Sequence, residues 1–211
     1  MSDPQRLRAE RPERYQAILR AACAEFARNG FERANVNAIA ERVGVGKGTL
    51  YNYASSKQEL FLQAVEYAAG QVIAHIKVHV SHRAAPEERM RQLVLADLTF
   101  MDRHQNEYML MVAVFYGANF LYGKGTSYLD LALRAYREFF AMAEDICRDW
   151  MGAEALEARG GSAVVFQVLA LIEAANLSTW ANPEVDLDRP RDAERIMAML
   201  RHGLGGPAPQ Q

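Results

Sequence analysis

The feature that most constrains this chain is a helical repeat of apolar residues that continues along almost the whole sequence. The apolar residues of the first segment recur at steps of three and four, which places them on one face of a helix: Tyr15, Ile18, Leu19, Ala22 and Phe26. Convincing alternation of apolar and polar residues, which would indicate β-strands, is absent from the sequence. The sequence therefore predicts an all-α protein.

Capping and turn residues mark the ends of the first predicted helices. The first helix is expected from about Pro12 to Asn29, because proline suits a first turn and Gly30 supplies a left-handed stop. A short second helix follows the N-cap residue Asn35, and a third helix begins near Lys47.

The fourth helix opens at a capping box, in which Ser56 and Glu59 stand three residues apart. This helix is expected to run into the late seventies. Glycine and proline breaks separate the later segments. The remaining helices are expected at about 87–103, 106–121, 127–152, 162–180 and 189–202.

Composition narrows the class of protein. Half of the 211 residues are hydrophobic, yet no run of eighteen uncharged apolar residues and no N-terminal signal region is present, so a cytoplasmic protein is expected. Cys23 and Cys147 are too far apart for a disulfide framework and are expected in the core, with a redox switch as the less favoured alternative. We find no nucleophile elbow, phosphate loop or paired zinc motif, and therefore predict no enzymatic activity.

Charge is distributed unevenly along the chain. The formal net charge is −2, but residues 1–60 hold 10 Lys and Arg against 7 Asp and Glu, while the remainder holds 14 against 19. A basic head on an acidic body would turn one end of the molecule toward phosphate groups.

Residues 31–57 carry the pattern of a DNA-binding helix-turn-helix, because two short helices flank a turn that contains glycine. Gly46 and Gly48 keep the start of the third helix slim, and Lys47 can reach a guanine edge or a phosphate. The same geometry also occurs as plain packing in helical proteins. The residues expected to pack against the first helix are Val36, Ile39, Ala40, Val45 and Leu50.

Several spaced segments resemble the TetR family of helix-turn-helix transcriptional regulators. The segments that carry the resemblance are Phe26–Phe31, Ile39–Val45, Gly48–Tyr51 and Ser56–Leu60. They agree with the family in order and spacing. The chain departs from the family's usual pattern in three places: Asn35 or Val36 stands where Thr or Ser is common, Gly46 where Ser is common, and Ala54 where Phe is common.

The resemblance implies a three-helix DNA-binding head over residues 12–65. A fourth helix would join this head to a helical body over residues 66–203 that binds a ligand and forms a homodimer. Residues 204–211, rich in Gly, Pro and Gln, are expected to be a disordered tail. The residues expected to face DNA are Asn35, Val36, Asn37, Lys47, Gly48, Thr49, Tyr51, Asn52, Tyr53 and Lys57.

Residues 100–150 are dense in aromatic and Met side chains. Most of them must be ordinary core, because helices with this spacing need apolar faces. Some could line an effector cavity, since Met and aromatic surfaces adapt to varied apolar ligands and aromatic faces can also hold a cation. The residues predicted for this pocket are Phe100, Met101, Tyr108, Met111, Phe115, Tyr116, Phe120, Tyr136, Phe139 and Phe140.

The stretch Ala163–Ala175 is apolar on almost every side and must be covered on more than one face. In the TetR family the last two main helices pair with those of a second subunit, so the resemblance implies a dimer interface here. A buried central helix in a monomer is the alternative. The residues predicted for the interface are Val165, Phe166, Leu169, Ile172, Ile196, Met199 and Leu200.

His75, His79 and His82 stand at i, i+4 and i+7, a spacing that could present imidazoles as metal ligands. No Cys or acidic residue adjoins them, and a solvated helix end is the favoured interpretation. We therefore predict no metal and no cofactor, and metal sensing stays as the first alternative effector class.

Taken together, the residues and the resemblance predict a sequence-specific regulator that binds double-stranded DNA as a homodimer, with no membrane partner. We expect a repressor that a small, largely apolar or aromatic effector releases from a palindromic operator. Activation is the alternative, because the outcome depends on where the operator lies relative to the promoter. Two other classes stay open. One is a ligand-binding protein whose DNA-binding head no longer functions, and the other is an enzyme on a helical scaffold, which would need a polar catalytic cluster inside the aromatic pocket.

Overall fold

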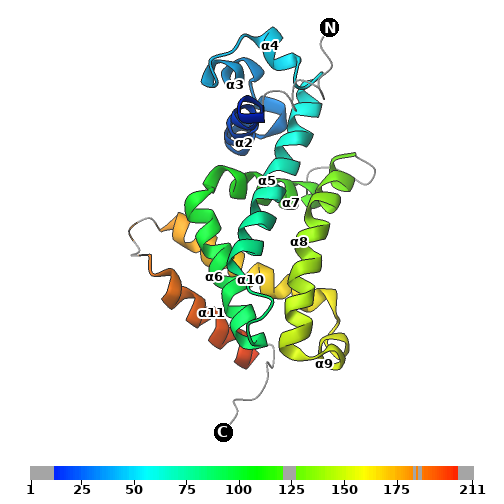
Figure 1. Cartoon of the computed structure of the whole chain (residues 1–211), viewed down its shortest axis with the longest axis vertical. Helices are drawn as coiled ribbons and strands as arrows, with labels where there is room; N and C mark the ends of the chain where they lie inside the picture. The colour runs from blue at the N-terminus through cyan, green and yellow to red at the C-terminus, as the bar shows by residue number, and fades with distance from the viewer. Residues whose placement is uncertain (1–11, 121–126, 183, 185–186, 204–211) are drawn as a thin grey trace. The chain divides into compact units, whose positions relative to one another are not determined.

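A computed structural model of the chain describes residues 12–120, 127–182, 184 and 187–203, and every regular element in these ranges is an α-helix (Figure 1). The all-α prediction is therefore confirmed. With the labels of Figure 1, the helices are α2 (Pro12–Arg33), α3 (Val36–Arg42), α4 (Lys47–Tyr51), α5 (Lys57–His79), α6 (Pro86–Arg103), α7 (Gln105–Phe120), α8 (Ser127–Met151), α9 (Ala153–Ala158), α10 (Ser162–Ala181) and α11 (Arg189–Gly203).

Most helix ends lie within one or two residues of the prediction, but two details differ. The short helix α9 was not expected from the sequence. Helix α2 also continues past the expected stop, because Gly30 bends the chain at φ 67° and ψ 172° and a further helical stretch follows it. The predicted tail 204–211 lies outside the described residues.

The helices fall into two compact units. Unit 1 comprises Met1–Gln71 and His104–Tyr136, and unit 2 comprises Val72–Arg103 and Arg137–Gln211. The predicted functional ranges 12–65 and 66–203 stay a prediction, because compactness alone assigns neither DNA binding nor ligand binding to a unit.

The core of unit 1 forms where α2 packs against α3 and α7. The ring of Phe61 makes edge contacts with Phe26 at 5.0 Å and with Phe31 at 5.3 Å between centroids. Burial of each large apolar side chain contributes about 1.5–3 kcal/mol. The fully buried members of this core are Ile18, Ala22, Cys23, Ile39, Leu50, Ala54, Leu60, Ala64, Val65 and Ala68.

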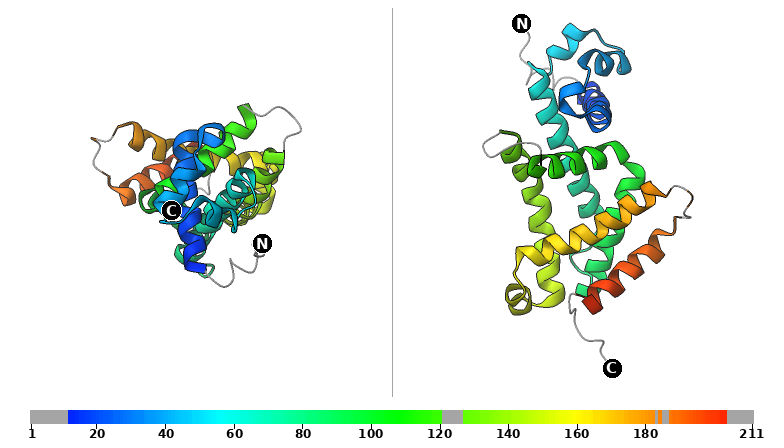
Figure 2. Two further views of the ribbon diagram at one scale, coloured as in Figure 1. Left: turned by 90° about the horizontal axis from the view of Figure 1, so that it is seen from above. Right: turned by 180° about the vertical axis from the view of Figure 1, so that it is seen from behind.

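In unit 2, α6 packs against α10 and α11, and α10 also contacts α11. Figure 2 shows these two C-terminal helices from behind, in yellow-orange and red. The core of this unit includes the fully buried residues Met90, Leu93, Leu98, Val168, Ile172, Met197 and Leu200.

Ion pairs tie α6 to its neighbours at several positions. The buried guanidinium of Arg89 pairs with Asp145 at 2.9 Å and also with Asp149. The side chain of Arg189 makes a two-point contact with Asp102, with Nε 2.9 Å from one carboxylate oxygen. Glu87 accepts hydrogen bonds from Trp150 and Arg201, and all of these contacts lie within unit 2.

Within the described ranges, no helix is both long and apolar enough to cross a membrane.

Candidate nucleic-acid interface

The candidate interface is the pair α3 and α4 with the turn between them. Asn35 caps α3, since its Oδ1 accepts a hydrogen bond from the Asn37 amide at 2.9 Å. Gly44 adopts φ 67° in the turn, and the Val45 amide donates to the Ala40 carbonyl at 3.0 Å. Glycine adopts this left-handed conformation without the steric cost that a Cβ would bring, and it therefore suits the turn.

The inner faces of α3 and α4 pack as predicted. Ile39 and Leu50 are fully buried and Ala40 is 2% exposed, while Val45 is partly buried against the same core. A helix of only five residues, such as α4, is held by this packing and not by its own hydrogen bonds.

The outer face of α4 presents the residues expected to meet DNA. Lys47, Gly48, Thr49 and Asn52 are all exposed, and Tyr51 is half-buried. A Cβ added at Gly48 would meet no atom within 4 Å, so this end of α4 stands open. The exposed set combines one cation, a hydroxyl and an amide on a narrow helix, which suits a major groove.

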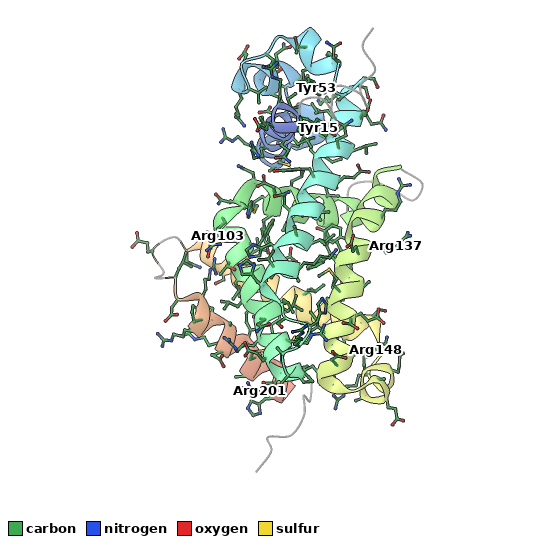
Figure 3. All side chains as sticks on the ribbon, in the orientation of Figure 1. Tyr15, Tyr53, Arg103, Arg137, Arg148 and Arg201 are labelled. Atoms are coloured by element: carbon green, nitrogen blue, oxygen red, sulfur yellow. The ribbon has the colours of Figure 1, made fainter. Side chains whose placement is uncertain are left out.

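Tyr53 was expected to face DNA, and the structure corrects this. Its side chain is 1% exposed and stacks on Tyr15, with ring centroids 6.1 Å apart and planes 10° from parallel (Figure 3). Tyr53 lies in the turn that follows α4, where its amide donates to the Leu50 carbonyl at 2.9 Å, and this turn directs its ring toward Tyr15. The Val36 side chain is likewise buried at 8% exposed, which leaves only its backbone for DNA.

Lys57 was expected to reach a flanking phosphate, but the structure gives its ammonium group other partners. Its Nζ donates to the Glu32 carbonyl at 2.9 Å and lies 5.1 Å from the centroid of the Phe31 ring. Lys57 therefore links the start of α5 to the segment that precedes α3.

The capping box at the start of α5 is present with one difference. The Glu59 amide donates to Ser56 Oγ at 3.0 Å, as predicted, but the Glu59 carboxylate accepts from the amide of Ser55 at 2.7 Å. The Glu59 carboxylate also accepts from Gln63 Nε2 at 2.8 Å. These contacts fix the chain where it enters α5.

Sequence reasoning missed Glu25, a carboxylate buried in unit 1 at 6% exposed. Its Oε1 accepts hydrogen bonds from the Asn35 amide and from Asn29 Nδ2, each at 2.9 Å. A signal was present in the sequence, because Glu25 interrupts the apolar stripe that contains Ile18 and Ala22.

The residues predicted for an effector pocket are distributed over both units. In unit 1, Tyr108 and Met111 are buried and the Phe115 and Tyr136 rings lie 5.2 Å apart. The Tyr136 hydroxyl donates to the Met111 carbonyl at 2.6 Å.

In unit 2, Phe100, Met101 and Phe139 are buried, and the Phe139 and Phe140 rings lie 6.1 Å apart. The side chains of Tyr116 and Phe120 lie outside the described part of the structure. The pocket stays a prediction.

The residues predicted for the dimer interface divide into two groups by burial. Val165, Ile172, Ile196 and Leu200 lie in the interior of unit 2, each at most 4% exposed, and Leu169 is half-buried. Phe166 and Met199 are 45% and 57% exposed. Among these predicted residues, Phe166 and Met199 are therefore the ones exposed enough to contact a partner.

The histidine segment has its own internal contacts. The His75 and His79 rings stack at 4.1 Å between centroids, and His79 Nδ1 lies 2.8 Å from the His75 carbonyl. His75 Nε2 also lies 3.3 Å from Thr99 Oγ1. In the described ranges, no three His, Cys, Asp or Glu side chains are grouped so as to hold a metal ion.

Both cysteines occupy the core, as expected. Burial is the main cause that raises the pKa of the Cys23 thiol well above its usual range, and the nearby charge of Glu107 adds to it. Burial also raises the pKa of Cys147 to about 12, and Glu144 contributes to the shift.

The Asp97 carboxyl on α6 titrates far from its usual range. Burial raises its pKa to about 7, and the charge of Glu173 on α10 acts in the same direction. The hydrogen bond from Asn176 Nδ2, at 3.3 Å, opposes the shift.

The sequence of the chain is similar to a known protein family and to several curated regulators. Residues 18–64 match the family model described as bacterial regulatory proteins of the tetR family. The chain is 26% identical, over 93% of its length and 85% of the relative's, to the HTH-type transcriptional activator FasR of Mycolicibacterium smegmatis. It is 36% identical to the HTH-type transcriptional repressor KstR of Rhodococcus jostii, over 41% of this chain and 40% of that protein.

A solved structure has the same fold. The transcriptional regulator FadR of Bacillus subtilis, determined in complex with stearoyl-CoA, superposes with a TM-score of 0.67 at 17% identity. The superposition covers 90% of this chain and 98% of that one.

Proposed function

Because the chain belongs to the TetR family of bacterial regulatory proteins and is a helix-turn-helix transcriptional regulator, we propose that it binds a palindromic operator as a homodimer and represses transcription. A small, largely apolar effector then releases it from the operator.

One observation carries the DNA-binding part of the proposal. Helix α4 rests on the buried Leu50 while Lys47, Thr49 and Asn52 project from its exposed side. A short helix seated in this way can enter a major groove without losing its packing. Two such heads one helical turn of DNA apart would match a palindrome, which supports the homodimer.

A salt-dependent DNA titration tests this proposal. We expect specific binding of two subunits per site on DNA from beside the protein's own gene, or on a site selected from random DNA. Lys47→Ala is expected to weaken operator binding, and to lower the slope of log affinity against log salt by about one if the lysine contacts a phosphate. Tyr51→Ala is expected to weaken binding as well.

Lys77→Ala is the matched control, because it removes the same charge from a residue of unit 2 that pairs with Glu138 at 2.7 Å. If Lys47→Ala and Tyr51→Ala bind like the parent while Lys77→Ala does too, the assigned DNA face is wrong. If the parent binds only weakly, without sequence preference, even after selection from random DNA, the regulator does not act through this head.

Support for an apolar effector comes from the aromatic and Met content of α6, α7 and α8 and from the stearoyl-CoA bound to FadR. The effector arm of the titration therefore uses stearoyl-CoA, stearate and free CoA. Release of the operator by stearoyl-CoA and not by free CoA would favour an acyl-chain ligand. If stearate also releases the operator, the apolar chain is sufficient and the CoA group is not required. If none of the three compounds releases the operator, acyl compounds are removed from the proposal.

Activation is the second candidate, because FasR, a relative that matches 93% of this chain, is named an activator. Measurement of transcripts from the genes beside the operator, with and without the protein, separates the two. A rise on deletion supports repression, and a fall supports activation.

The exposed side chains of Phe166 on α10 and Met199 on α11 support the homodimer. The two helices that carry them contact each other, and an exposed apolar patch commonly marks an interaction surface. We expect Phe166→Glu to shift the protein toward monomer in analytical ultracentrifugation and to weaken operator binding with it.

A further inference from the structure

The segment that joins α2 to α3 determines how the helix-turn-helix is presented. Gly30 interrupts α2 with φ 67°, and the chain makes one more helical stretch before it reaches Asn35. The Ala34 amide donates to the Gly30 carbonyl at 3.2 Å, which closes the bend on itself. The bend is held at its start, where Phe31 packs against Phe61 and Lys57. A side chain that fixes its other end, at Asn35, sets where α3 begins.

Glu25 is the side chain that fixes this end. It is 6% exposed, and a single carboxylate oxygen, Oε1, receives both the Asn35 amide and Asn29 Nδ2 at 2.9 Å. A carboxylate is costly to bury unless donors compensate it, and hydrogen bonds to a charged group are stronger than neutral ones. The two donors come from the two sides of the bend, so the oxygen ties the last regular turn of α2 to the N-cap residue of α3.

Asn35 passes this constraint on to α3. Its amide is held by Glu25 while its own Oδ1 accepts from the Asn37 amide, so one residue is fixed to α2 and caps α3 at once. Helix α3 in turn positions α4 through the Val45 amide, which donates to the Ala40 carbonyl at 3.0 Å.

We propose that Glu25 is a positioning residue for DNA recognition, which sets the direction of α3 and thereby the orientation of the α4 face that carries Lys47 and Thr49. The carboxylate touches no DNA itself. The role requires its acceptor oxygen, while the negative charge strengthens the two hydrogen bonds but is not needed to form them. This inference rests on the proposed DNA-binding function.

Two variants separate the acceptor from the charge. Glu25→Gln keeps an oxygen at the same reach and loses the charge, whereas Glu25→Asp keeps the charge and withdraws the oxygen by one methylene. Both are tested in the full-length protein by operator titration, well below the melting temperature of each variant. We expect Glu25→Gln to bind within about threefold of the parent. Glu25→Asp should lose about tenfold or more, because the shorter side chain leaves the Asn35 amide without its acceptor.

The control is Ile18→Val, which removes one methyl group from a fully buried residue of α2 and leaves the Glu25 contacts in place. If affinity only followed the stability of the head, Ile18→Val and Glu25→Asp would lose the same affinity for each degree by which their melting temperatures fall. Positioning instead requires Glu25→Asp to lose much more affinity per degree than Ile18→Val. Amide hydrogen exchange at Asn35 gives a second readout, because its protection should persist in Glu25→Gln and decrease in Glu25→Asp.

Several results would overturn the inference. Equal affinity for Glu25→Asp and the parent would do so, as would a loss in Glu25→Gln as large as in Glu25→Asp. A gain in affinity on Glu25→Gln alone, with Glu25→Asp unchanged, would show that only the charge acts. If Glu25→Asp fails to fold, the exchange and affinity of Glu25→Gln still decide, since loss of either one in a folded protein removes the acceptor argument. Failure of the parent to bind any operator would instead count against the proposed function.

Discussion

The buried ion pair of unit 2 should respond unequally to removal of its positive and its negative members. Arg89 is only 6% exposed at its side chain, whereas Asp145 and Asp149 are 61% and 44% exposed. Neutralising both acids therefore leaves a guanidinium in the interior without a counter-charge. Replacing Arg89 with Met leaves two carboxylates that water can already reach.

The expected magnitudes follow from this geometry. Breaking a buried pair from one side costs about 3–5 kcal/mol, and partial solvation of this pair lowers the expected cost of Asp145→Asn with Asp149→Asn to about 2–4 kcal/mol. An apolar residue of similar volume often replaces a buried charge at little cost, so Arg89→Met should cost about 0–1 kcal/mol. The Arg89 Nε supports the lower figure, because it is buried without a hydrogen-bond partner among the described residues.

Urea unfolding at neutral pH and one fixed subunit concentration measures the difference, since the stability of the proposed homodimer would depend on concentration. The acid double variant should lower the unfolding midpoint by about 1 M, given typical urea slopes. Arg195→Met is the control. The Arg195 side chain is 59% exposed, and its Nη1 lies 3.5 Å from Asp192 Oδ1 in a surface ion pair that should contribute little to stability. An Arg89→Met protein that loses as much stability as the double variant would refute the reasoning.

Three further predictions test other parts of the structure. Because the pKa of Asp97 is raised to about 7 in the folded protein, the folded state binds more protons than the unfolded state between about pH 4 and 7, and stability should fall as pH rises through that window. Asp97→Asn should therefore raise the unfolding midpoint clearly at pH 8 and much less at pH 5; an equal effect at both would contradict the buried carboxyl. Gly48→Ala, at an open helical position, should stabilise the protein by about 0.5–1 kcal/mol in thermal unfolding and yet weaken operator binding, and unchanged affinity would show that a slim α4 is not required. The thiols of Cys23 and Cys147, whose pKa values burial raises, should resist iodoacetamide at pH 8 until urea unfolds the protein, as followed by mass spectrometry, and rapid modification of the native protein would reopen a redox role.

The helix boundaries could be predicted because the signals for them are local. Asn35 caps α3 and Ser56 caps α5 through hydrogen bonds that span only two or three residues. Such contacts depend on the neighbouring sequence alone, so the residue type at one position is informative. Helix α9 was missed for the same reason, since its N-cap residue Gly152 makes no side-chain cap.

The roles of single residues in the interface were harder to predict, because they depend on which face of α4 the core takes. Tyr53 carries a hydroxyl that suits DNA, yet its ring packs on Tyr15, which lies thirty-eight positions earlier in the sequence. Lys57 likewise has a side chain that could bind a phosphate. Its ammonium group instead donates to the Glu32 carbonyl and lies over the Phe31 ring, both in the segment before α3. In both cases a tertiary contact decides the role, and no local pattern contains it.

Helix α4, with five residues from Lys47 to Tyr51, has a consequence for how the protein unfolds. An isolated helix shorter than about 12 residues is marginal in water, so α4 exists only while Leu50 remains seated in the core of unit 1. Its amides should therefore exchange with solvent at the rate at which that core opens, and not by separate fraying of a surface turn. Bound DNA would slow this exchange throughout the head by the same factor, so recognition and cooperative unfolding of the head would form one equilibrium.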